Sequence, residues 1–146
     1  MTKSSRTKAP WHLWVIGIIA LLWNAMGAVD YFLSQTKNEA YMSMFTPEQL
    51  EFFYSFPSWS VALWAIAVWG GLLGCILLLL RKKLAVSVFL VSLICMVINT
   101  IYIYAFTNGM EVMGGPFELA FSAAIFIVAV FLYFYSKNMQ ARNILT

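Results

Sequence analysis

Residues 59–106 read WSVALWAIAVWGGLLGCILLLLRKKLAVSVFLVSLICMVINTIYIYAF: two long apolar runs, 59–80 and 84–106, separated only by Arg81-Lys82-Lys83. A helix needs about 20 apolar residues to cross the roughly 30 Å hydrocarbon core of a bilayer, where it satisfies its own backbone hydrogen bonds. The runs are continuous and lack the alternation that is typical of transmembrane β-strands. This stretch therefore predicts two transmembrane helices joined by a short basic turn.

Two further segments, residues 11–33 and 117–135, have the same length and apolar character. Hydrophobic residues make up 62% of the 146 residues and charged residues 10%, against about 45–50% and about 25% in soluble domains. The mean hydropathy is +0.82. We therefore predict an all-α integral membrane protein, with residues 1–146 forming one domain built on a bundle of four transmembrane helices.

The basic residues predict the orientation of the bundle, because cytoplasmic loops carry an excess of Lys and Arg. Eight of the nine flank the four segments on one side, and only Lys37 lies on the other. This pattern predicts that both termini are cytoplasmic. It also accounts for the net charge of +3 without a nucleic-acid partner, since no basic face is interleaved with aromatic residues. The eight are Lys3, Arg6, Lys8, Arg81, Lys82, Lys83, Lys137 and Arg142.

A cleaved signal peptide is the main alternative for the first segment. Residues 3–8 and 11–22 resemble the basic and apolar regions of such a peptide, and Ala25-Met26-Gly27 could serve as a cleavage site. The apolar stretch continues past that site to Leu33. We therefore expect the segment to be retained as the first span.

The loop over residues 34–58 is the only long connection, and it contains a helix signal. Thr46-Pro47-Glu48-Gln49 offers Thr as N-cap, Pro at the first helical position and Gln to complete a capping box. An aromatic run follows, so we expect a short amphipathic helix on the outer surface. It would be either a structural cap on the bundle or a lid over a binding site.

Polar residues inside the bilayer are costly and often functional. Counted at about 1.5 Å per residue, the amides and acids of this chain lie at or above the midplane, and the cytoplasmic half holds only Ser87, Ser92 and the cysteines. We therefore predict a polar pocket that opens to the outer face. The ordinary alternatives are hydrogen bonds between helices for the two asparagines and a helix N-terminus for the glutamate. The candidate ligand-binding residues are Trp23, Asn24, Asp30, Asn99, Tyr102 and Glu118.

Asp30 is the hardest of these to explain as a structural residue. If the first helix ended near it, the helix dipole would disfavour its negative charge. Either the helix continues beyond the membrane or the carboxylate has a partner. Lys37 is the nearest cation along the chain but lies two turns away, which is far for a direct pair.

Small residues in the second span predict close helix packing. Gly70 and Gly74 form a small-xxx-small pair that would act within the bundle or between copies of the chain. Cys75 and Cys95 lie at different depths in their spans, so we interpret them as small buried hydrophobic residues rather than as a disulfide.

The sequence offers little for catalysis or metal binding. The single histidine, His12, excludes a bis-histidine haem within one chain and any histidine-rich metal site. There is no CxxC, phosphate-binding glycine loop or nucleophile–base motif. We therefore predict neither enzyme activity nor a cofactor or metal. Methionines on the outer side, Met42 with Met44 and Met110 with Met113, could hold Cu(I), although packing is their ordinary role.

Seven stretches of the chain form a distinctive set: Trp11-His12-Leu13-Trp14, Leu22-Trp23-Asn24, Gly27 with Asp30-Tyr31, Asn38-Glu39-Ala40-Tyr41, Phe45-Thr46-Pro47-Glu48-Gln49, Phe56-Pro57-x-Trp59 and Val68-Trp69-Gly70-Gly71. These stretches resemble a family of small bacterial membrane proteins of about this length that are commonly labelled "sugar transporter" or hypothetical protein. The resemblance covers nearly the whole chain and implies a bacterial inner-membrane location.

Two functional hypotheses follow. The first is a protein that binds or transports a small polar solute, which the family label suggests is a sugar, through the outer-face pocket. The second is a non-catalytic accessory or interaction subunit of a larger membrane complex. Both hypotheses make the lipid bilayer a partner and allow a homo-oligomer.

Overall fold

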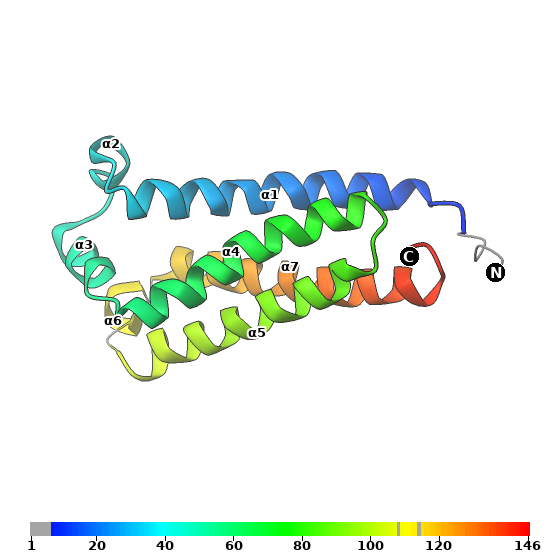
Figure 1. The fold of residues 1–146 in the computed structure, drawn as a ribbon. Helices are drawn as coiled ribbons and strands as arrows, with labels where there is room; N and C mark the ends of the chain where they lie inside the picture. The colour runs from blue at the N-terminus through cyan, green and yellow to red at the C-terminus, as the bar shows by residue number, and fades with distance from the viewer. Residues whose placement is uncertain (1–6, 108, 114) are drawn as a thin grey trace.

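The structure, a computed structural model, describes residues 7–107, 109–113 and 115–146. Every regular element in these residues is a helix (Figure 1). The four long helices are α1 (Trp11–Gln35), α4 (Ser58–Leu79), α5 (Leu84–Ala105) and α7 (Pro116–Ala141). The three short ones are α2 (Glu39–Met42), α3 (Pro47–Tyr54) and α6 (Gly109–Met113).

The four long helices are each long and apolar enough to cross a membrane. This confirms the prediction of four helices of spanning length and apolar character, which indicates a membrane-embedded protein. Their bounds lie within two residues of the predicted ones, with one exception: α7 continues from the predicted end at residue 135 to Ala141. The helix continues because its last turns still pack against the bundle, where Ser136 and Met139 are buried.

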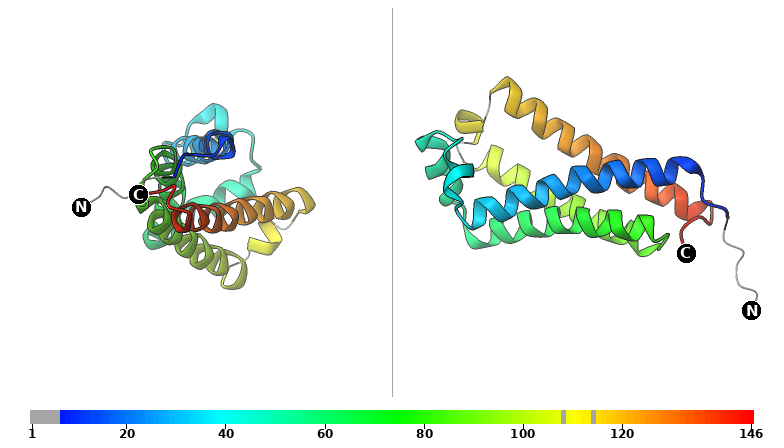
Figure 2. Two further views of the ribbon diagram at one scale, coloured as in Figure 1. Left: turned by 90° about the vertical axis from the view of Figure 1, so that its right-hand side faces the viewer. Right: turned by 90° about the horizontal axis from the view of Figure 1, so that it is seen from above.

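The long helices form an open arc rather than a closed ring. Helix α1 packs along α4, α4 along α5, and α5 along α7. Helices α1 and α7 approach each other at one end and diverge toward the other (Figure 2). The approaching end holds Thr7, the α4–α5 turn at residues 81–83 and residues 142–146, and we call it the basic end. The opposite end holds α2, α3 and α6, and we call it the loop end (Figure 1).

The two described chain ends therefore lie together at the basic end, where the Thr7 amide donates to the Asn143 carbonyl at 3.1 Å. A layout with both termini on one side of the membrane requires this arrangement. Which side faces the cytoplasm stays a prediction.

Three glycines let both neighbours approach α4 closely. A Cβ built at Gly71 would lie 2.3 Å from Oδ1 of Asn24 in α1. On the other side, a Cβ at Gly74 would lie 2.5 Å from the Phe89 ring of α5, and one at Gly70 would lie 3.2 Å from Ser92 Cβ. Helix α4 is therefore the central helix. The helical turn that contains Gly70, Gly71 and Gly74, which we call the glycine turn, contacts α1 and α5 at nearly the same height.

Three long helices end in tight turns whose first residue after the C-cap has a positive φ although it is not glycine. These residues are Lys37 (φ 53°), Arg81 (φ 60°) and Asn143 (φ 63°). In each turn, two amides donate back to the last turn of the helix, which is the Schellman arrangement. The outer bonds run from Asn38 N to Leu33 O (3.0 Å), Lys82 N to Leu77 O (2.9 Å) and Ile144 N to Met139 O (2.9 Å).

The last of these turns directs the chain end back into the bundle. Ile144 and Leu145 are 0% and 2% exposed and join the buried cluster of the basic end. Arg81 binds this segment, because its Nε donates to the Ile144 carbonyl at 3.1 Å and its carbonyl accepts from the Thr146 amide at 3.0 Å. The Arg81 guanidinium also donates to the Thr7 carbonyl. One side chain in the α4–α5 turn therefore binds both chain ends.

At the loop end, α3 begins as the sequence predicts. Thr46 accepts from the Gln49 amide at 3.1 Å, and the Gln49 side chain accepts from the Thr46 amide at 3.1 Å, which completes the capping box. The helix packs against α6, and Phe52 is its buried residue.

The contact at Gly74 yields a stability test. We expect Gly74→Ala to lower the free energy of unfolding by about 1–3 kcal/mol, because α4 and α5 must separate to admit the methyl group. Gly27→Ala is the matched control, since nothing lies within 4 Å of a Cβ at that helical position. Tryptophan fluorescence during unfolding in mixed micelles of dodecyl sulfate and a neutral detergent measures the difference. Equal stability of the two variants would contradict a close α4–α5 contact.

Candidate functional site

The structure places the predicted polar residues in separate helix contacts. Asn24 lies between α1 and α4, where its amide donates to the Ala20 carbonyl at 2.8 Å and to Cys75 Sγ at 3.4 Å. Its Oδ1 occupies the space that the missing side chain of Gly71 leaves open. Asn24 therefore joins two packed helices.

Asn99 and Tyr102 lie one turn apart on α5 and share a contact with the start of α4. Asn99 is 8% exposed, and its Oδ1 accepts from the Ser60 hydroxyl at 2.5 Å. The Tyr102 ring meets the Trp59 ring edge to face, with centroids 4.5 Å apart. This pair of contacts holds the loop-end parts of α4 and α5 together.

Asp30 has a partner that its position in the sequence does not indicate. Helix α1 continues past Asp30 to Gln35. The Oδ1 atom of Asp30 accepts a hydrogen bond from the Tyr41 hydroxyl of α2. Lys37, the nearest cation in sequence, instead lies over the Tyr54 ring with Nζ 4.6 Å from the centroid. The carboxylate thus ties the loop-end cap to α1.

The two remaining candidates are Trp23, which contacts α7 from α1, and Glu118, which belongs to α7. Trp23 of α1 meets Phe121 with ring centroids 5.8 Å apart. Glu118 lies in the first turn of α7, where its carboxylate fills the space beside the N-cap residue Gly115. An acid in that turn is favoured by the helix dipole.

Taken together, the six candidates take part in different contacts, and the part of the chain that the structure describes has no buried side-chain nitrogen or oxygen without a hydrogen-bond partner. Two cavities lie elsewhere, and neither is lined by any of the six. The smaller, of about 240 Å³, lies at the loop end between α3 and α6. It is lined by Glu48, Glu51, Phe52, Ser55 and Val112.

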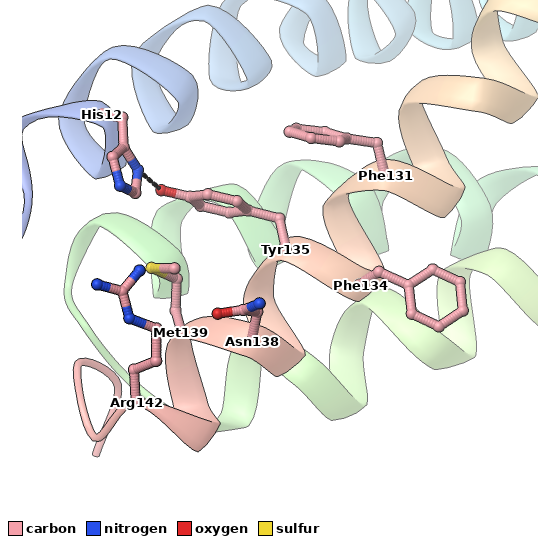
Figure 3. Close-up of a pocket in the computed structure, with 7 residues that line it drawn as sticks. All are labelled: His12, Phe131, Phe134, Tyr135, Asn138, Met139 and Arg142. Atoms are coloured by element: carbon pink, nitrogen blue, oxygen red, sulfur yellow. Dashed lines mark hydrogen bonds between the residues drawn. The ribbon is translucent and has the colours of Figure 1, made fainter.

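The larger of the two, with a volume of about 400 Å³, is a shallow, open depression at the basic end between α1 and α7 (Figure 3), and we call it the basic-end cavity. His12 and Tyr135 line one side of it and are joined by a hydrogen bond of 2.6 Å between His12 Nδ1 and the Tyr135 hydroxyl. Either group can be the donor. The Phe131 ring stacks on the Tyr135 ring with centroids 5.6 Å apart. The lining consists of His12, Phe131, Phe134, Tyr135, Asn138, Met139 and Arg142.

This cavity combines apolar and hydrogen-bonding groups in the way that small-molecule sites do. Phe131 and Phe134 are 48% and 58% exposed, whereas Met139 is 2% exposed. Asn138 and Arg142 are also exposed and bring an amide and a guanidinium to the opening. The cavity is therefore open to a molecule that has both an apolar and a polar part.

Sequence reasoning missed this site because it assigned the lining residues to other roles. His12 and Tyr135 lie at the ends of the first and fourth predicted spans, where aromatic residues are common at a membrane interface. Arg142 is one of the basic residues that predict the orientation. Residues 131, 135, 138 and 142 of α7 follow one another at steps of four, three and four, which places them on one helix face. That spacing was the available signal, but the partner residue on α1 is more than a hundred positions away.

Comparison of the chain with protein-family models, with curated proteins and with solved structures finds no match. The cavity is therefore interpreted from its own residues.

The Asp30–Tyr41 contact predicts a titration. Burial, the hydrogen bond donated to Asp30 and the charge of Asp30 all raise the pKa of the Tyr41 hydroxyl well above its usual value. We expect Asp30→Asn to lower this pKa toward the usual value of about 10, because the carboxylate no longer opposes ionisation. Absorbance at 295 nm follows phenolate formation, and Tyr41→Phe identifies the contribution of this one tyrosine. An unchanged titration in Asp30→Asn would show that the two groups do not interact.

Proposed function

We propose that this protein is a non-catalytic membrane protein that binds a small amphiphilic molecule in the cavity at the basic end. The observation that carries the proposal is the cavity itself, in which a hydrogen-bonded His12–Tyr135 pair faces exposed phenylalanine rings and a guanidinium. An apolar chain would lie against the rings, and a polar head would lie at the polar side chains.

The position of the cavity along α7 supports an amphiphile rather than a fully polar solute. Helix α7 has 26 residues, or about 39 Å at 1.5 Å per residue, so it exceeds the roughly 30 Å of hydrocarbon. Its last turns carry Lys137, Asn138 and Gln140 and therefore leave the apolar layer. The cavity then lies at the boundary between hydrocarbon and water.

The side chains around the cavity favour binding over chemistry. Its lining contains no serine, cysteine or carboxylate that could act as a nucleophile beside His12. The described residues also contain no group of three or more His, Cys, Asp or Glu placed to hold a metal ion. A binding role needs neither a nucleophile nor a metal ion.

Transport of a polar solute, including a sugar, through an outer-face pocket stays a prediction, as does a location in a bacterial inner membrane. The polar residues that motivated that pocket are engaged in helix contacts, so their support for it is weaker than the support for the basic-end site.

The binding proposal can be tested through the single histidine of the chain. The protein, carrying a tag without histidine, is placed in phosphatidylcholine nanodiscs, and the rate at which diethyl pyrocarbonate modifies His12 is followed by mass spectrometry. We expect dodecyl maltoside or dodecyl phosphate to slow this modification in a saturable way, because a bound amphiphile covers the ring.

Two variants of α7 serve as test and control. Asn138→Phe places a ring in the cavity and is expected to abolish the amphiphile-dependent protection. Gln140→Phe puts the same ring on an exposed neighbour outside the lining and is expected to behave as wild type. If neither amphiphile protects His12, or if Asn138→Phe is protected as well as wild type, the proposal fails.

The accessory-subunit hypothesis also stays a prediction, and one observation favours it. In the most apolar stretches of α1, α4 and α5, 22%, 22% and 28% of the residues are buried, but only 6% in that of α7. Lipid can cover such a surface as well as a partner can. Purification in a mild detergent at the natural expression level is expected to recover a stoichiometric membrane partner, and recovery of the chain alone would count against this role.

A further inference from the structure

We propose that the head group taken by the basic-end cavity is a phosphate-type anion carried on an alkyl chain, as in an acidic membrane lipid. This inference rests on the proposed function and names the chemical class of its ligand. It follows from the charges around the cavity, from the donors that line it and from the order of apolar and polar groups along α7.

The two ends of the molecule differ in charge. All six acidic side chains belong to the loop half, in the second half of α1, in α2, α3 and α6, and in the first turn of α7. The described basic end carries cations and no acidic side chain. An anion at this end is therefore attracted by several cationic side chains and meets no acidic side chain among the described residues. The described cations are Lys8, Arg81, Lys82, Lys83, Lys137 and Arg142.

Arg142 is the cation that lines the cavity. It follows the last residue of α7, and the residues that line the cavity include no acidic side chain. A guanidinium presents planar N–H donors that match the oxygens of a phosphate in pairs. The Asn138 amide supplies further donors at the same opening, and His12 lies across from them (Figure 3).

The position of Arg142 is held by tertiary contacts. The next residue, Asn143, makes the left-handed turn, and the buried Ile144 and Leu145 fix the chain just beyond it. The Arg81 bond to the Ile144 carbonyl secures the same segment. The guanidinium therefore extends from an anchored backbone, although the side chain itself is exposed.

The apolar groups lie on the other side of the cavity from Arg142. Phe131 and Phe134 precede it on α7 by three and two turns, and about 16 Å of helix axis separates Phe131 from Arg142. Figure 3 shows the two phenylalanine rings away from the guanidinium. A lipid with its head at Arg142 would have the first part of its chain beside these rings, whereas free phosphate would leave them unused.

The His12 protection assay in phosphatidylcholine nanodiscs also tests the head group, with dodecyl phosphate, dodecyl maltoside and inorganic phosphate as probes at one pH. We expect dodecyl phosphate to protect at about one tenth of the concentration that dodecyl maltoside needs, because a charge-assisted hydrogen bond adds to the contact of the chain. Inorganic phosphate is expected to give no protection at these concentrations.

The matched pair of variants is Arg142→Gln and Lys83→Gln, each of which removes one exposed cation of the basic end. Arg142→Gln is expected to remove the preference for dodecyl phosphate, so that the two amphiphiles protect His12 at about the same concentration. Lys83→Gln, which lies outside the lining, is expected to keep the preference. Because both variants change the net charge equally, a general effect of surface potential would appear in both.

The outcomes separate the two proposals. Equal protection by both amphiphiles, or an unchanged preference in Arg142→Gln, overturns the anionic head group but leaves amphiphile binding in place. Protection by inorganic phosphate as strong as that by dodecyl phosphate overturns the requirement for an alkyl chain. The absence of protection by every probe overturns the proposed function and this inference together.

Discussion

The close approach of α1 and α5 to the glycine turn of α4 is the contact on which the bundle depends. In lipid, helices gain little from hiding apolar surface, so association relies on packing and on hydrogen bonds between helices. Gly71 leaves room for the Asn24 side chain, and Gly74 leaves room for the Phe89 ring. The asparagine also bonds to Cys75 one turn along α4. With α4 held on both sides, α7 packs mainly along α5 and touches α1 through Trp23–Phe121 and His12–Tyr135.

The polar side chains within the spans serve this packing. Asn24 and Asn99 each join two helices, and Asp30 holds the loop-end cap through Tyr41. Such bonds are worth about 0.6–2 kcal/mol each in membrane proteins, which suits a structural role. The groups left available for a ligand lie at the other end, where the last turns of α7 become polar and the exposed Asn138 and Arg142 line the cavity. Segregation of acids to the loop half and bases to the basic end gives this cavity its positive surroundings.

The candidate site was only partly predictable, and the reason differs from residue to residue. Asn24 and Asp30 were identifiable because a polar group in an apolar run is conspicuous, but the sequence could not say whether they meet a ligand or another helix. His12 and Tyr135 looked like ordinary interfacial aromatics because each lies among other aromatic residues at the end of its own span. Their bond of 2.6 Å exists only because α1 and α7 approach at the basic end. The position of Arg142 beside the cavity depends on two further features, the extension of α7 to Ala141 and the burial of Ile144 and Leu145 beyond it.

The sequence by itself determined the helical class, the four long apolar helices with all of their ends except the last one of α7, and the capping box of α3. These depend on residues close together in the chain: uninterrupted apolar length, flanking charges and the Thr46–Gln49 spacing. Only the tertiary structure decided which helices are neighbours, that Arg81 binds both chain ends, and that three helices end in left-handed turns without glycine. Those features depend on contacts between distant residues. The backbone of Arg81, for example, adopts a φ of 60° because the hydrogen bonds of its side chain to distant residues outweigh the cost of that conformation.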